Sequence, residues 1–271
     1  IQTEDYLQHV RLVVEDVSFV DEASMLVTET KAKAARYWAN VSHSYRNVWR
    51  AVGRRPAIHG GSYSFRSSTG CALLIDNIWH AEAAGVPRET LDGFEWATVT
   101  GFMKLCDRSS GCQVDLSRLV AMPLNYGLPN GDDWNHKFPA FRNVGQHAAD
   151  GSYRVHHLHS HSSIPHLGTR NNNSAVTVHD VSGRHGLPNM MTHANFTRGH
   201  IYNADNLSSC FYDLAFYSQH SSLLIENSTN ITGASCARFG GSSHGSVVRV
   251  ERVTHVQRAS FYAIGGGSED L

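Results

Sequence analysis

The sequence is poor in charge and lacks any long apolar run. Charged residues make up 17 % of its 271 residues, and the formal net charge is −1. A nucleic-acid footprint needs a stripe of Lys and Arg, so we expect no nucleic-acid partner. A membrane-spanning helix needs roughly 18 or more mostly apolar residues in a row, and the sequence has no such stretch. We therefore expect no insertion into a membrane.

Cysteine is scarce, and its number is odd. Five cysteines do not make a disulfide framework. Cys106 and Cys112 are close enough in sequence to pair, and Cys210 and Cys236 could stack in a repetitive fold. The interpretation that we favour is that all five are buried small hydrophobic residues. The chain starts at Ile1 without a secretory signal, so we expect a processed product or a fragment that lacks its N-terminal part.

What the sequence does contain is a repeat. Residues 72–77 read Ala-Leu-Leu-Ile-Asp-Asn, and residues 222–227 read Ser-Leu-Leu-Ile-Glu-Asn. Related segments recur at intervals of about 23 to 25 residues near the C-terminus, and a fixed period of that size is the signature of a solenoid. The segments begin at Val14, Trp38, Phe141, Val155, Val178, Ile201, Ile225 and Val250.

Each copy has the pattern of a short strand followed by a tight polar turn. Apolar and polar residues alternate over three to five positions, which is the period of a β-strand. An Asn or Asp often follows, and these residues tolerate the left-handed backbone of a turn. Stacked repeats would place their side chains in a ladder. The Leu-x-x-Leu-x-Leu pattern of leucine-rich repeats is absent, and a β-sandwich is the remaining alternative.

This pattern resembles the right-handed parallel β-helix of the pectin-lyase-like superfamily, which includes pectate lyases, polygalacturonases and many bacteriophage tailspikes. The resemblance is one of fold and covers roughly residues 10–271. It implies one all-β domain, residues 1–271, built as a single-stranded right-handed parallel β-helix with inserted surface loops near 124–137 and 186–198. It also implies a polysaccharide as the partner, a homotrimer, and an extracellular location or a place in a virion tail.

Loops that interrupt such a repeat are where a functional site is expected. The largest covers residues 124–137. It contains two acids and three side chains that suit sugar binding: Asp132, Asp133, Trp134, His136 and Lys137. Trp134 would stack on a sugar ring, and either acid would contact hydroxyls or transfer a proton. The alternative is a solvated turn built on Asn130, Gly131 and Asp132.

A histidine-rich segment, residues 156–166, is the second departure from the repeat. On a strand His157, His159 and His161 point to one side, and three histidines on one face could bind a zinc ion. Alternate residues of a strand lie about 7 Å apart, which is too wide for one tetrahedral site. We therefore expect no metal and no cofactor, and we interpret His157 and His159 as substrate-binding groups in a groove.

The period also predicts which side chains are neighbours in successive repeats. His157 should stack on Asp180, and His159 should stack, through Ser182, on Asp205. A carboxylate beside an imidazole is a plausible acid–base pair. Asp180 is slightly better explained as a member of the turn ladder, which leaves Asp205 as the stronger catalytic candidate. One further column is predicted to contain His156, His179, Tyr202, Glu226 and Glu251.

Three functions are compatible with these residues. A tailspike-like glycoside hydrolase needs two carboxylates, roughly 5 Å apart for retention or 6.5 to 9.5 Å apart for inversion. The candidates for that pair are Asp132, Asp133, Asp180 and Asp205. A polysaccharide lyase would neutralise a uronate with Ca²⁺ or basic residues, and no acidic triplet stands out as a Ca²⁺ site. A non-catalytic adhesin or virion fibre needs no acids in a groove.

Overall fold

A computed structural model describes the central part of each repeat. The described residues are 7–19, 26–27, 38–50, 58–59, 64–80, 99–100, 102–119, 141–157, 162–164, 166–182, 185–186, 189–205, 213–214, 217–229 and 243–255. Within these ranges the regular structure consists of β-strands, and no helix is present. No helix suited to crossing a membrane therefore occurs in this part of the chain.

The strands are short and alternate between long and very short ones. They are β1 (Arg11–Phe19), β2 (Leu26–Val27), β3 (Ser42–Arg50), β4 (Ile58–His59), β5 (Ala72–His80), β6 (Val99–Thr100), β7 (Phe102–Leu105), β8 (Gln113–Leu119), β9 (Phe141–Val144), β10 (Ser152–His156), β11 (Ser162–Ser163), β12 (His166–Leu167), β13 (Ala175–Ser182), β14 (His185–Gly186), β15 (Asn189–Met190), β16 (Arg198–Asp205), β17 (Asp213–Leu214), β18 (Ser222–Glu226) and β19 (Val247–Glu251).

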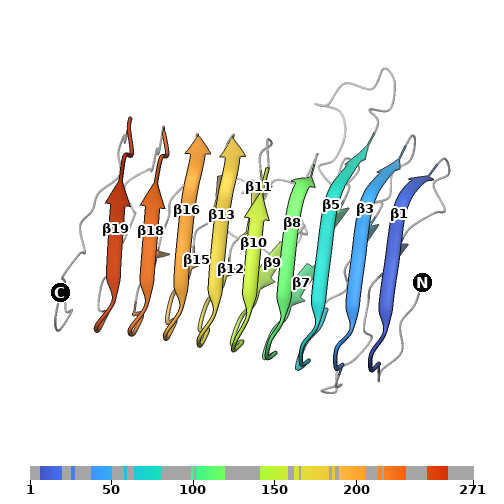
Figure 1. The fold of residues 1–271 in the computed structure, drawn as a ribbon, viewed down its shortest axis with the longest axis horizontal. Coiled ribbons are helices and arrows are strands. Elements are labelled where there is room, and N and C mark those ends of the chain that lie inside the picture. The colour runs from blue at the N-terminus through green and yellow to red at the C-terminus, as the bar shows by residue number, and fades with distance from the viewer. Residues whose placement is uncertain are drawn as a thin grey trace, which may run out of the picture.

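Nine of these strands form one parallel sheet, which we call the long sheet. Its order is β1-β3-β5-β8-β10-β13-β16-β18-β19, so each strand lies beside the next long strand in the sequence. Figure 1 shows the nine strands in a single row, with β1 at one end and β19 at the other. The short strands between them pair in the same way, in parallel sheets of five, three and two strands. The described part is thus all-β, and its topology is compatible with a β-helix or another solenoid.

The predicted repeat is confirmed in the C-terminal part of the long sheet. Val155 pairs with Val178, and the same position continues through Ile201, Ile225 and Val250, at spacings of 23 to 25 residues. In the N-terminal part the spacings grow to between 30 and 41 residues, because long connections separate the strands.

Two of the predicted repeat starts occupy other positions. Phe141 begins β9, which belongs to the five-stranded sheet, and Trp38 precedes β3 by one turn. Val14 is in register, because it pairs with Tyr45 at the position that Ile75 and Val155 occupy in later strands.

Alternate residues of the long sheet face a continuous apolar core. Tyr45, Ile75 and Leu116 follow one another at the same position and are buried, and Val178 and Ile201 continue the column. Burial of each such side chain contributes about 1.5 to 3 kcal/mol. Because each repeat exposes this face unless a neighbour covers it, the stability of the sheet comes from stacking.

A column of left-handed residues ends the straight part of each long strand. Its backbone φ angles lie between 46° and 56° at Asp16, Asn47, Asn77, Arg118, His157, Asp180, Asn203, Asn227 and Arg252. The predicted Asn and Asp ladder is therefore present, and the amide of Asn77 donates to Asn47 at 2.7 Å, which donates to Asp16 at 2.8 Å. Arg and His occupy three of the same positions, at a cost of roughly 1 to 2 kcal/mol each relative to glycine.

A second turn precedes the long strands and was not recognised in the sequence. Residues 65–70, 106–111, 145–150, 168–173 and 191–196 each have left-handed backbone at their first, third and sixth positions. The last of these turns, with β15 before it and β16 after it, occupies most of the region where we expected a loop near 186–198. That region is therefore regular over residues 189–198. The loop expected near 124–137 lies outside the described residues.

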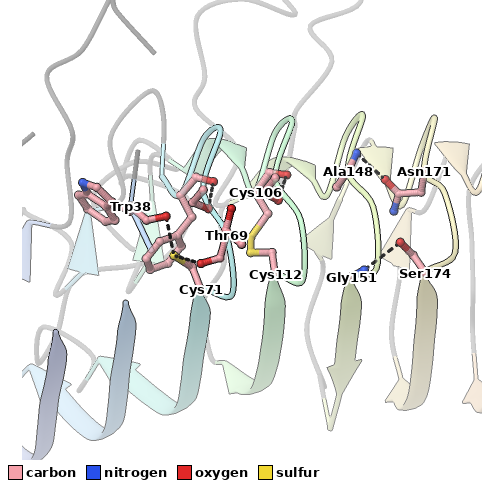
Figure 2. The surroundings of a disulfide bond; sticks show 12 residues. Trp38, Thr69, Cys71, Cys106, Cys112, Ala148, Gly151, Asn171 and Ser174 are labelled. Carbon is pink, nitrogen blue, oxygen red and sulfur yellow. Dashed lines mark hydrogen bonds between the residues drawn. A yellow bond between two sulfur atoms is a disulfide. The ribbon is translucent and has the colours of Figure 1, made fainter. Parts of the chain in front are cut away.

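A disulfide bond closes the turn between β7 and β8. Cys106 and Cys112 are bonded and buried, which corrects the expectation that both are unpaired hydrophobic residues. Cys71 is a buried free thiol, and it donates to the carbonyls of Trp38 and Thr69 at 3.8 and 3.7 Å (Figure 2). Burial raises the pKa of the Cys71 thiol, so it stays protonated. The other two cysteines lie outside the described residues.

Candidate functional site

The outward face of the long sheet is hollowed by a groove of about 400 Å³. It crosses the first five strands of the sheet, β1, β3, β5, β8 and β10. Small side chains, Ser42, Ser44, Ala72 and Ser152, line it, because every second residue of a strand points to this face. The groove is therefore open over several strands and rich in hydroxyl groups.

Charged side chains stand at both ends of the groove. At the β1 end Arg46 lies 3.7 Å from Glu15, and about half of each side chain is exposed. Arg11 adds a second guanidinium there. At the β10 end the groove is lined by Asp115 and Arg154, which are neighbours in the register. Both ends thus offer one carboxylate and at least one guanidinium to a ligand.

Aromatic rings stack next to the β10 end of the groove. His156, His179 and Tyr202 occupy successive strands at the predicted column, which is confirmed. The ring centres of His156 and His179 lie 4.7 Å apart with planes 10° from parallel, and those of His179 and Tyr202 lie 4.6 Å apart at 2°. The rings therefore use their faces on each other and turn their edges to other partners.

His179 is held between an arginine and an aspartate. Arg154 Nε donates to His179 Nε2 at 3.1 Å, so Nε2 is the acceptor nitrogen. The proton of a neutral ring then sits on Nδ1, which donates to Asp180 Oδ2 at 2.6 Å. This hydrogen bond, helped by one from Asn203, lowers the pKa of the Asp180 carboxyl. Asp180 is thus an anion that orients an imidazole.

His156 links the ring stack to the groove. Its Nε2 lies 2.8 Å from Asp115 Oδ1, and its Nδ1 is buried without a hydrogen-bond partner. Burial lowers the pKa of His156 and outweighs the opposing effect of Asp115. The Asp115 carboxylate is therefore positioned by a ring that burial favours in its neutral form.

The carboxylates at the C-terminal side of the same face are also engaged. Glu226 lies 2.8 Å from His200 Nε2 and forms an ion pair with Arg252. Asp205, the favoured catalytic candidate, accepts a hydrogen bond from Thr229 Oγ1 at 2.7 Å. It pairs with Ser182 in the register, as predicted. These contacts give both acids a role in joining neighbouring strands.

The predicted site residues are only partly brought together. Asp180 and His157 are adjacent, with His157 Nδ1 4.0 Å from Asp180 Oδ2, and both belong to the left-handed column. Asp132, Asp133, Trp134, His136, Lys137 and His159 lie outside the described residues. Asp115 and Arg154 were missed, because each looks like an isolated polar residue on a strand until the register places them side by side.

The carboxylates of the groove do not match the spacing of a glycosidase pair. Glu15 and Asp115 both line it, but their strands are three steps apart in the sheet. Neighbouring strands are about 4.8 Å apart, which separates these acids by about 14 Å. Inverting glycosidases use carboxylates at most about 9.5 Å apart. Within the described ranges, no three His, Cys, Asp or Glu side chains converge on a metal position.

Comparison with known protein families, with curated proteins and with solved structures finds no match to this chain. The functional argument therefore rests on the groove, the side chains at its ends and the ring stack beside it.

Proposed function

We propose that this chain is a right-handed parallel β-helix that binds a polysaccharide in the groove of the long sheet. The observation that carries the proposal is the groove itself, open across five strands and lined by hydroxyl, amide and charged side chains. Sugars present many hydroxyl groups, and such a surface can donate to and accept from them. Five strands span about 19 Å, which suits an extended chain of several sugar units.

The proposed ligand runs across the strands, along the row shown in Figure 1. Ser42, Ala72 and Ser152 follow one position across the sheet, so each step along the ligand meets a similar environment. A polymer with a regular repeat fits such a surface better than a compact metabolite does. Asp115 and Arg154 would end the row with a hydrogen-bond acceptor and a donor in fixed positions.

Hydrolysis of the bound polysaccharide is the second part of the proposal. It would depend on Asp132 or Asp133, because the acids of the groove are too far apart to act as a pair. A tailspike-like role, a homotrimer and an extracellular or virion location accompany it as predictions. The buried Cys106–Cys112 disulfide supports an oxidising compartment.

A panel of bacterial capsular and O-antigen polysaccharides tests both parts at once. Binding is measured by isothermal titration calorimetry, new reducing ends report hydrolysis, and ultraviolet absorbance of unsaturated uronates reports a lyase. Binding without cleavage would favour the adhesin or fibre alternative. If cleavage occurs, Asp132→Asn and Asp133→Asn should abolish it, and unchanged rates in both variants would exclude those acids.

A matched pair of variants locates the binding site. Ala72 lines the groove, and Ala175 occupies the same register position on β13, where it is exposed and outside the groove. We expect Ala72→Trp to fill the groove and weaken binding at least about tenfold, a cost of roughly 1.4 kcal/mol. Ala175→Trp should leave affinity unchanged. Equal affinities of the two variants would place the ligand elsewhere.

A further inference from the structure

Two imidazoles of this chain are held in the same way, each between an aspartate and an arginine. His179 accepts from Arg154 Nε at 3.1 Å and donates to Asp180 at 2.6 Å. On another edge of the molecule, His147 Nε2 lies 3.1 Å from Arg170, and its Nδ1 lies 3.3 Å from Asp107. Only the first of these arginines lines the groove.

We propose that Arg154 is a proton-gated binding group for an oxyanion carried by the polysaccharide. The inference rests on the proposed function and extends it, since it names a charged substituent that the groove would recognise. The oxyanion is a carboxylate, a phosphate or a sulfate, because the planar guanidinium binds all three through paired hydrogen bonds.

The gate follows from the hydrogen bond between the two side chains. A neutral His179 offers the lone pair of Nε2 to Arg154 and so holds the guanidinium over the ring stack. A protonated imidazole carries hydrogen on both nitrogens, so Nε2 can no longer accept. The two groups then repel each other as like charges. Arg154, which is exposed, is free to turn toward the groove.

The surroundings of His179 decide how well the charged ring is tolerated. Asp180, on the same strand, balances the positive charge. From β10 the ring meets His156 and His157, and from β16 it meets Tyr202. Asp115 reaches this group through His156. Two carboxylates therefore face two cations when His179 is protonated, and an added oxyanion would be drawn to Arg154.

The sign of the pH dependence follows by linkage. An anion bound to the released Arg154 favours the protonated ring, so binding takes up a proton and affinity rises as pH falls. Couplings of this kind are typically 5- to 150-fold. We expect affinity for an acidic oligosaccharide to rise about tenfold between about pH 8 and pH 5, where imidazoles titrate. Affinity for a neutral oligosaccharide should stay within about twofold.

Three variants of the whole chain test the gate by calorimetry across this pH range. Arg154→Gln removes the anion-binding group and should abolish the rise. His179→Gln keeps an acceptor that does not titrate, so it should flatten the pH profile. Arg170→Gln breaks the equivalent pair away from the groove and should behave like the wild type. Uronate, phosphorylated and sulfated oligosaccharides are titrated separately to identify the oxyanion.

The outcomes separate this inference from the function beneath it. Binding at all pH values with an unchanged rise in Arg154→Gln would overturn the gate and leave the groove intact. If nothing binds, the proposed function fails, and ¹⁵N NMR of labelled histidine still decides the gate. His179 Nε2 should show the shift of an unprotonated acceptor at high pH, and Arg154→Gln should change it. A proton on Nε2 at about pH 8 would overturn the gate.

Discussion

The two halves of the long sheet join their repeats by different means. In the C-terminal half, from β10 to β19, strands follow one another every 23 to 25 residues. Just before each strand stands a buried hydroxyl, at Ser174, Thr197, Ser221 and Ser246. In the N-terminal half the same position holds Val41, Cys71 and Cys112, all buried, and the spacing varies.

The hydroxyl column forms hydrogen bonds from one repeat to the next. Ser174 Oγ accepts from the amide of Gly151 at 3.1 Å, as Figure 2 shows, and Ser221 Oγ accepts from Thr197 at 3.1 Å. Ser246 Oγ does the same for Ser221. In the N-terminal half a disulfide and apolar contacts replace these bonds. Short repeats are thus linked by polar contacts between backbones, and repeats that carry long insertions by the core.

The largest effect should come from a charge placed in the core column. Ile225 is 3 % exposed at the centre of the C-terminal half, and Val250 is only partly buried on the last described strand. We expect Ile225→Asp to destabilise the chain by about 5 kcal/mol or more and to unfold it. Val250→Asp should cost less. Urea unfolding followed by circular dichroism checks the order, and a wild-type midpoint for Ile225→Asp would contradict the register.

Acid should weaken the N-terminal half first. His43 is 1 % exposed among the rings of Trp38, Phe65 and Tyr45, and neither ring nitrogen has a partner. Burial lowers the pKa of His43 to about 4. The unfolded chain therefore binds this proton first, and stability is lost as pH falls from about 6.5 to about 4, by about 3 kcal/mol.

The variant His43→Leu isolates that effect. It should remove this part of the acid loss and raise the free energy of unfolding even at neutral pH, because two unsatisfied nitrogens disappear. The exposed His220→Leu is the control and should follow the wild-type pH profile. The measurement is the urea midpoint at several pH values. Parallel profiles for His43→Leu and the wild type would show that His43 does not set the acid limit.

Reduction should affect the N-terminal half and spare the other. The Cys106–Cys112 bond closes a loop with a sequence separation of 6. A loop of this size constrains the unfolded chain by about 2 kcal/mol. We expect the double variant Cys106→Ala and Cys112→Ala to lose about that much in urea unfolding. Hydrogen exchange should show faster opening near β8 and unchanged protection at β16.

The smallest predicted effect concerns one hydroxyl of the C-terminal half. Ser221→Ala leaves the buried amide of Thr197 without its acceptor. We expect a loss of about 1 to 2 kcal/mol by urea unfolding. Ser222→Ala, on the adjacent exposed position, is the control and should change stability by less than about 0.5 kcal/mol. Equal losses in the two variants would show that the hydroxyl column does not join the repeats.

The sequence predicted the fold best where its spacing is constant. Val178, Ile201 and Ile225 were placed correctly because no insertion separates their repeats. Trp38 and Phe141 were misplaced, since a local alternation of apolar residues does not say which of several parallel sheets a strand joins. Long connections in the N-terminal half remove the one clue that would, namely the distance to the next copy.

The turns and the site were harder to predict for a related reason. The second turn uses Phe, Cys, Gly and Met at its first position, so backbone conformation repeats where residue type does not. Arg118 and His157 likewise share the ladder that Asn and Asp suggested. The contact between Arg154 and His179 depends on side-chain direction across strands, which spacing alone does not give.

The left-handed column after each long strand has an evolutionary consequence. Its geometry is set by the backbone, and residues as different as Asp180, Arg118 and Asn203 adopt it. Replacing one side chain by another therefore alters the molecular surface at a cost of only about 1 to 2 kcal/mol. The column is a row of interchangeable positions at the edge of the outward face, where new specificities can be tried without redesigning the architecture that carries them.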